Sequence, residues 1–72
     1  MSPLTVEISP VEEALRRHPQ PAVRRLQVEE SPAAVTLTGT VPTYYLKQLA
    51  QEAVLPLLAG RELRNRVEVV RG

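Results

Sequence analysis

Two pairs of arginines, Arg16-Arg17 and Arg24-Arg25, are the side chains in this sequence best suited to bind a ligand. A guanidinium group binds phosphate through two parallel hydrogen bonds, and a basic residue near an anionic lipid surface contributes about 1 kcal/mol of attraction. Because the two pairs are close in sequence, we expect one local basic patch. The alternative is a solvated surface neutralised by nearby glutamates, namely Glu12, Glu13, Glu29 and Glu30.

Tyr44 and Tyr45 are the only aromatic residues. A tyrosine has an apolar body and a polar tip, which suits either a core or a lipid or protein interface. We expect at least one of the two to pack in the core. The candidate binding patch comprises Arg16, Arg17, Arg24, Arg25, Tyr44 and Tyr45.

The sequence contains no set of residues that could assemble a catalytic or metal site. It has no Cys and a single histidine, His18, whose predicted place near a helix C-terminus favours an interaction with the helix dipole. A metal site or an acid–base pair needs several such groups together. The three glycines are scattered and form no phosphate-binding loop. We therefore predict that the protein is not an enzyme and uses no metal and no cofactor.

Length and charge indicate a small, nearly neutral domain. The 72 residues allow one domain, and the net charge of +1 gives no field that would draw the chain to nucleic acid. The N-terminus lacks the basic start and apolar core of a signal peptide. No apolar run approaches the roughly 20 residues that span a bilayer. These features predict a cytoplasmic protein.

The first helix has a clear start signal. Ser9 as N-cap, Pro10 at the first helical position and Glu12 three residues after the cap are typical of a helix N-terminus. The predicted helix spans 10–18, and Pro19 ends it. The segment 19–21, with two prolines, is predicted to be a stiff linker.

Alternation of polar and apolar residues predicts two strands after this linker. They span 25–29 and 35–41, and a turn over 30–33 joins them as an antiparallel hairpin. We expect Glu29 and Glu30, which flank the turn, to be solvated. The residues predicted to face the core are Leu26, Val28, Val35, Leu37 and Val41.

The second half of the sequence predicts a helix and a final strand. Pro42-Thr43 opens the helix, whose apolar residues recur with helical spacing on one face. Pro56 should end or kink it, and Gly60 is a suitable C-cap. The final strand spans about 65–70, with Val67 and Val69 facing inward.

These elements predict an α+β domain with two helices packed on one face of a three-stranded mixed sheet, in the order α-β-β-α-β. The hairpin is antiparallel, and the crossover through the second helix adds a parallel strand. We expect a lead over 1–8, either an edge strand or disordered, a single domain over 9–70 and a tail over 71–72. The residues predicted on the uncovered sheet face are Arg25, Gln27, Thr36, Thr38, Thr40, Arg66 and Glu68.

In order and motifs the chain resembles the BON domain family, small modules with an α-β-β-α-β order. The segment 35–42 resembles the family's strand that leads into a helix, and the segment 63–69 resembles its closing strand. The family-motif residues, to which we assign structural roles, are Leu37, Gly39, Val41, Lys47, Ala50, Asn65, Val67 and Val69. We expect the second helix to pack over Gly39, and the Asn65 side chain to cap a turn at the start of the last strand.

The sequence also departs from the family pattern. The turn over 30–33 lacks the usual Gly or Asn, Pro56 is unusual in the second helix, and Gly60 is followed by Arg61-Glu62-Leu63 where the family more often has Gly-Val. Many family members also carry an export signal or tandem copies. The departures leave the expected fold unchanged.

The resemblance implies a non-enzymatic interaction module. For this chain we predict binding of protein partners or self-association, because the missing export signal and the near-zero net charge argue against a dedicated membrane role. The alternative is binding to an anionic phospholipid surface through the arginine patch. Nucleic-acid binding ranks third, because the chain has neither a Gly-x-x-Gly loop nor an aromatic pair on the sheet face.

Overall fold

The structure, a computed structural model, describes residues 9–71; the lead predicted over 1–8 and the terminal Gly72 lie outside the described residues. The predicted α+β class and element order are confirmed, with the second and last predicted strands each divided in two. In chain order the elements are α1 (Pro10–Arg16), α2 (Pro21–Arg24), β1 (Gln27–Glu30), β2 (Ala34–Thr38), β3 (Thr40–Val41), α3 (Tyr44–Val54), the 3₁₀ helix η1 (Leu55–Leu57), β4 (Glu62–Asn65) and β5 (Glu68–Val69).

The start signal of α1 is visible as a hydrogen bond. The Ser9 hydroxyl accepts from the Glu12 N–H at 3.0 Å, which satisfies one of the backbone donors that a helix start leaves free. The helix ends at Arg16, two residues before the predicted end. Its buried side chains are Val11 and Leu15.

The predicted linker over 19–21 runs directly into a second helix that the sequence reading missed. Pro21 is the first residue of α2, a position that suits proline because its missing N–H would have no helical partner. The single turn of α2 buries Val23 completely. This short helix therefore contributes to the core as well as redirecting the chain towards β1.

β2 is the central strand of the three-stranded sheet. It pairs antiparallel with β1 and parallel with β4, as the predicted hairpin and crossover require. Ser31 shapes the hairpin turn, because its hydroxyl accepts from the N–H groups of Ala33 (3.3 Å) and Ala34 (3.0 Å). Side-chain bonding of this kind replaces the Gly or Asn that such a turn often contains.

The last strand differs from the prediction in its start and its continuity. β4 begins at Glu62, three residues before the predicted start at Asn65, and the pairing breaks at residues 66 and 67 before β5. Ala34 pairs with Glu62 and Thr40 with Glu68, which is the same offset, so neither strand gains a residue at the break. The short pair of β3 and β5 thus continues the β2–β4 pair beyond a bend.

Gly39 forms the bend between β2 and β3. Its φ of +128° lies in a region that side-chain-bearing residues rarely adopt, and a Cβ placed there would lie 2.8 Å from Cδ2 of Leu26. The expectation that the second helix packs over Gly39 is wrong. The close neighbour is Leu26, which fills the space beside the bend where the chain leaves α2.

Asn65 holds the opposite side of the same bend. It ends β4, where the prediction had it open the last strand. Its Oδ1 accepts from the Val67 N–H at 3.2 Å, and its Nδ2 donates to the Lys47 carbonyl of α3 at 3.3 Å. The side chain therefore closes a turn at the break and ties it to the helix.

α3 stops where Pro56 predicts. The helix ends at Val54, and Pro56 lies in η1, which tightens the last turn. Ala59 and Gly60 follow with φ of 54° and 84°, and the Arg61 N–H donates to the Leu58 carbonyl at 3.0 Å. Positive φ at both central residues makes this a type I′ turn, which returns the chain to β4.

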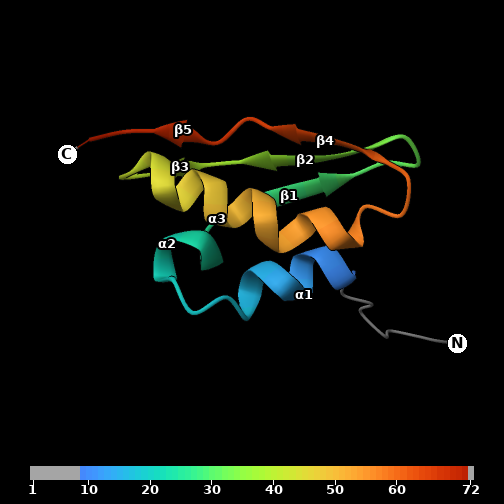
Figure 1. The fold of residues 1–72 in the computed structure, drawn as a ribbon, viewed down its shortest axis with the longest axis horizontal. Coiled ribbons are helices and arrows are strands. Elements are labelled where there is room, and N and C mark those ends of the chain that lie inside the picture. Colours follow the sequence, from blue (N-terminus) through green and yellow to red (C-terminus); the bar gives the residue numbers. More distant parts are fainter. Residues whose placement is uncertain (1–8, 72) are drawn as a thin grey trace, which may run out of the picture.

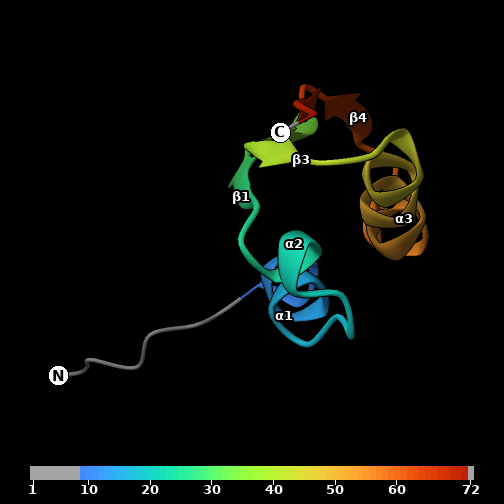
Figure 2. The ribbon, with the colours of Figure 1, turned by 90° about the vertical axis from the view of Figure 1, so that its left-hand side faces the viewer.

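The helices form one layer and the strands another (Figure 1). Viewed along the long axis, α1, α2 and α3 lie on the same side of the strands (Figure 2), and no element of residues 9–71 covers the other side. The core between the layers is aliphatic and consists of Val11, Leu15, Val23, Leu26, Val35, Leu37, Val41, Ala50, Val54 and Val67.

Candidate interaction surface

Arg16 binds the main chain of its own protein. Its Nη1 donates to the carbonyls of Arg24 at 3.1 Å and Leu26 at 2.8 Å, and its Nη2 lies 3.7 Å from the Glu12 carboxylate. These contacts tie the end of α1 to the segment between α2 and β1. The hydrogen-bond donors of Arg16 therefore stabilise the fold and are not free to bind a ligand.

Arg24 and Arg17 are also engaged within the chain. Arg24 Nη1 donates to the carbonyls of His18 at 2.8 Å and Pro19 at 3.2 Å, which fixes the loop between α1 and α2. Arg17 Nη2 lies 3.1 Å from Glu13, but the Arg17 side chain is 78% exposed. An exposed pair of this kind contributes roughly 0–1 kcal/mol, so Arg17 is held only weakly.

Arg25 differs from the other three arginines. It caps the C-terminus of α2 and is exposed, and it forms no ion pair with any acidic residue between 9 and 71. Its side chain lines a groove beside β3, described below. Arg24 also lacks an acidic partner, but it donates to carbonyls. Among the four arginines, Arg25 is therefore the one whose side chain forms neither an ion pair nor a main-chain hydrogen bond within residues 9–71.

Both tyrosines are exposed, so the expectation that at least one packs in the core is wrong. Tyr44 is 63% and Tyr45 66% exposed. They form the first turn of α3, after the cap in which the Thr43 hydroxyl accepts from the Leu46 N–H at 3.2 Å. The packed stripe of α3 begins only at Leu46, one residue beyond the tyrosines.

Exposed apolar side chains gather at the end of the molecule where α3 begins and β5 finishes. Val69, expected to face inward, is 36% exposed, and Val70 is 52% exposed. Val69 pairs with the buried Val41, so the two partners of this strand pair differ in exposure. We call the part of the molecule that carries Tyr44, Tyr45, Val69 and Val70 the β3–β5 end.

A groove of about 610 Å³, the β3 groove, adjoins the β3–β5 end. Gly39, Thr40 and Val41 line it along the strand, and Arg25 and Val70 stand at its sides. It lies where β1 would continue alongside β3 if the chain did not turn away at Arg25. The groove is open and combines apolar and hydrogen-bonding surface.

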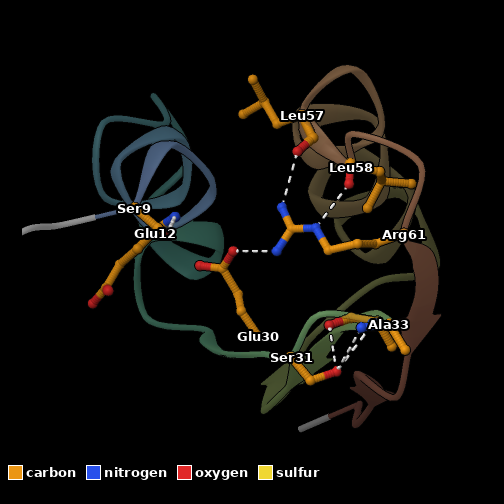
Figure 3. A network of polar contacts seen from close by, with 9 residues as sticks. Ser9, Glu12, Glu30, Ser31, Ala33, Leu57, Leu58 and Arg61 are labelled. Carbon is orange, nitrogen blue, oxygen red and sulfur yellow. Dashed lines mark hydrogen bonds and ion pairs between the residues drawn. The ribbon is translucent and has the colours of Figure 1, made fainter.

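A polar network occupies the opposite end of the long axis. Arg61 Nη1 donates to the Glu30 carboxylate at 2.7 Å, Nε to the Leu58 carbonyl at 2.8 Å, and Nη2 to the Leu57 carbonyl at 3.2 Å (Figure 3). We call this set, with Ser9 beside Glu30, the Arg61 network. It joins the end of β1 to the end of the helix layer.

Electrostatics in the Arg61 network favour the ionised carboxylate. The Ser9 hydroxyl and then the Arg61 guanidinium hold the pKa of Glu30 below its usual value, and burial opposes them only in part. Glu30 is exposed, as expected, but its carboxylate is held in an ion pair with Arg61 that the expectation did not include. The partner is distant in sequence, so neither hydrophobic periodicity nor a local motif could have identified the pair.

The remaining family-motif residues are placed in or against the core. Leu37, Val41, Ala50 and Val67 are almost completely buried, and Lys47 accepts the Asn65 hydrogen bond through its carbonyl. In the part of the chain that the structure describes, no three His, Cys, Asp or Glu side chains come together as metal ligands. No helix in that part is long and apolar enough to cross a bilayer.

Comparison with known proteins adds one finding. The profile of the BON domain matches residues 9–71, which is nearly the whole chain and agrees with the observed order of helices and strands. No curated protein and no solved structure matches the chain.

Proposed function

The chain belongs to the BON domain family, and from this premise we propose that it is a non-catalytic module that binds protein through the β3–β5 end, with a second copy as its first partner to test. The family is one of binding domains without catalytic activity. The proposal adds a surface and a class of partner. It rests on the distribution of exposed apolar side chains.

That distribution is uneven. The large apolar side chains exposed in residues 9–71 are Tyr44, Tyr45, Leu55, Val69 and Val70. Four of these five belong to the β3–β5 end, and α3 contacts both β3 and β5 there. Aromatic residues are enriched at protein interfaces because they bury a large area and keep a polar tip. Exposed apolar residues that are concentrated at one end of a molecule support a binding role more strongly than residues spread over the whole surface.

The arginines support protein over lipid as the ligand. Arg16 and Arg24 donate to main-chain carbonyls and Arg17 pairs with Glu13, so the two arginine pairs do not offer four free cations to a membrane. With a net charge of +1, attraction to an anionic surface would depend on few residues.

Sedimentation velocity of the full chain over a concentration series tests the proposal. We expect the sedimentation coefficient to rise with concentration as dimers form. The double variant Tyr44→Ser/Tyr45→Ser should remain monomeric, because it removes the two largest exposed apolar side chains. Leu55→Ser is the matched control, since Leu55 is exposed but lies in η1, and it should associate like the wild type. A wild-type chain that stays monomeric throughout would contradict self-association.

Phospholipid binding is the second candidate, and one observation favours it. The exposed tyrosine pair suits the headgroup region of a bilayer, and Arg25 has no acidic partner among the described residues. BON domains are associated with phospholipid surfaces. Flotation with phosphatidylglycerol vesicles, with phosphatidylcholine vesicles as control, tests this function. Salt-sensitive flotation with the anionic vesicles alone would support it.

A further inference from the structure

We propose that the β3 groove binds an extended peptide that carries an acidic side chain, with the peptide backbone adding a strand beside β3 and Arg25 pairing with the acid. The inference rests on the proposed function, protein binding, and deepens it by naming the chemistry of the partner. Strand edge, charge and groove shape each contribute to it.

Among residues 9–71, no strand pairs with the edge of β3 that faces the groove. The last β1–β2 pair is Gln27 with Thr38, and the chain then turns away through Arg25, whose φ of −90° and ψ of −7° are helical. Within the described part of the chain, β3 pairs with β5 alone, on its other side. An unpaired strand edge is a template for another strand.

Thr40 presents its backbone to this open edge. The carbonyls of Gly39 and Val41 accept from the N–H groups of Glu68 at 2.9 Å and Val70 at 2.8 Å, on the β5 side. Because successive residues of a strand direct their backbone groups to opposite sides, the N–H and C=O of Thr40 point towards the groove. A donor and an acceptor side by side are satisfied together by an extended peptide, whereas a phosphate group offers acceptors only.

The charge of the groove favours a peptide with an acidic side chain. No lining residue is acidic, and Arg25 is the one cation among them. The side chains of Gln27, Thr38 and Thr40 add hydrogen-bond donors nearby. A carboxylate would complete the hydrogen bonding of Arg25, since charge-assisted bonds of this kind are stronger than neutral ones. Val70 and Ala22 provide apolar walls for the neighbouring side chains.

An NMR titration of the ¹⁵N-labelled full chain tests the site. The probe is the peptide acetyl-Thr-Val-Glu-Val-Thr-amide, with the same peptide carrying Lys in place of Glu as control. We expect saturable shifts of the amides of Thr38, Gly39 and Thr40 and of Arg25 Nε with the Glu peptide only. Equal shifts with the Lys peptide, or shifts confined to other residues, would overturn the proposal.

Backbone methylation of the probe tests strand addition separately from charge. Two Glu peptides are compared, each N-methylated along one of its two edges. Pairing with Thr40 uses one edge of the peptide, so one methylated peptide should lose binding and the other should keep it. If both bind as well as the parent peptide, the peptide does not add as a strand, and the proposal fails.

Variants of the chain test the role of Arg25. Arg25→Gln should weaken the Glu peptide about tenfold, the loss expected for one hydrogen-bonded ion pair. Arg17→Gln is the matched control, because Arg17 is exposed and pairs with Glu13 outside the groove; it should bind like the wild type. Unchanged affinity in Arg25→Gln would overturn the proposal.

Vesicles separate the peptide from a lipid headgroup. Phosphatidylglycerol vesicles that shift Thr40 and Arg25 when the Glu peptide does not would assign the groove to lipid and contradict the proposal. The titration is done at a protein concentration below any self-association. Failure of the β3–β5 end to dimerise would therefore leave peptide binding measurable, and failure of peptide binding would leave the dimerisation result standing.

Discussion

Arg61 and Arg25 lie towards opposite ends of the long axis and have opposite surroundings. Arg61 gives its donors to two carbonyls at the end of the helix layer and to Glu30, and its side chain is only 20% exposed. Arg25 is exposed in the wall of an open groove, without an acidic partner among the described residues. One end satisfies its polar groups internally, and the other leaves a cation, a strand edge and apolar side chains available.

The difference indicates that one end of this short chain stabilises the fold, whereas the other remains open for binding. A domain of this size buries a small fraction of its surface compared with larger domains, so each polar contact that closes the fold matters. The Arg61 network joins β1 to the helix layer at one end through a small set of residues. The β3–β5 end stays open because Gly39 bends the ladder and the chain leaves β1 at Arg25.

The largest effect that we expect comes from breaking the Arg61 network. Arg61→Met should destabilise the domain by about 2–3 kcal/mol, because the Leu57 carbonyl and the Glu30 carboxylate lose their Arg61 donor and the Leu58 carbonyl keeps only the backbone N–H of residue 61. Urea unfolding at neutral pH measures the change. Arg64→Met is the control, since Arg64 is 50% exposed and lies 3.5 Å from Glu62; its effect should stay within about 0.5 kcal/mol. Equal losses in the two variants would show that the network has no special role.

The next largest effect concerns the bend at the open end. Gly39→Ala should cost about 2 kcal/mol in the free energy of unfolding, because φ is +128° and the new Cβ would meet Leu26. Gly60→Ala is the comparison, since Gly60 also has a positive φ, of +84°, but a Cβ there meets nothing within 4 Å. The difference between the variants in urea unfolding reports the contact with Leu26 together with the difference between a φ of +128° and one of +84°. A Gly39→Ala variant as stable as the wild type would show that β3 can reorient without cost.

The sequence predicted the features that depend on local signals and missed those that depend on contacts between distant segments. Ser9 and Pro10 fixed the start of α1, Pro56 fixed the end of α3, and alternation identified the hairpin of β1 and β2, because all these signals are local. Helix α2 was missed although Pro21 is a helix-start signal, because one turn is too short to show periodicity. The neighbour of Gly39 was assigned wrongly. A glycine within a strand indicates that another segment packs closely against it, but not which segment.

The candidate site was the less predictable part. Its residue types were visible, but exposure depends on where the core ends, and the apolar stripe of α3 starts one residue after Tyr45. The four arginines looked equivalent in sequence. Only the folded chain shows that Arg16 and Arg24 bind carbonyls, while Arg25 lines a groove made by segments that are distant in sequence.

The smallest effect that we expect is the pH dependence of the Arg61 network, which tests whether its closure is electrostatic. The folded-state pKa of Glu30 is lowered by Ser9 and Arg61, so the ionised carboxylate stabilises the fold. This contribution is fully present above the usual Glu pKa, and it is lost as pH falls through the lowered pKa of the folded state. The advantage of the wild type over Glu30→Gln, roughly 1 kcal/mol or less at neutral pH, should therefore shrink in acid. Urea unfolding of both proteins across the acid range measures it, and Glu29→Gln corrects for the loss of one charge from the same strand. A difference between wild type and Glu30→Gln that is constant with pH would show that Glu30 acts through hydrogen-bond geometry alone, and the contrast with Arg25 would then be one of shape and not of charge.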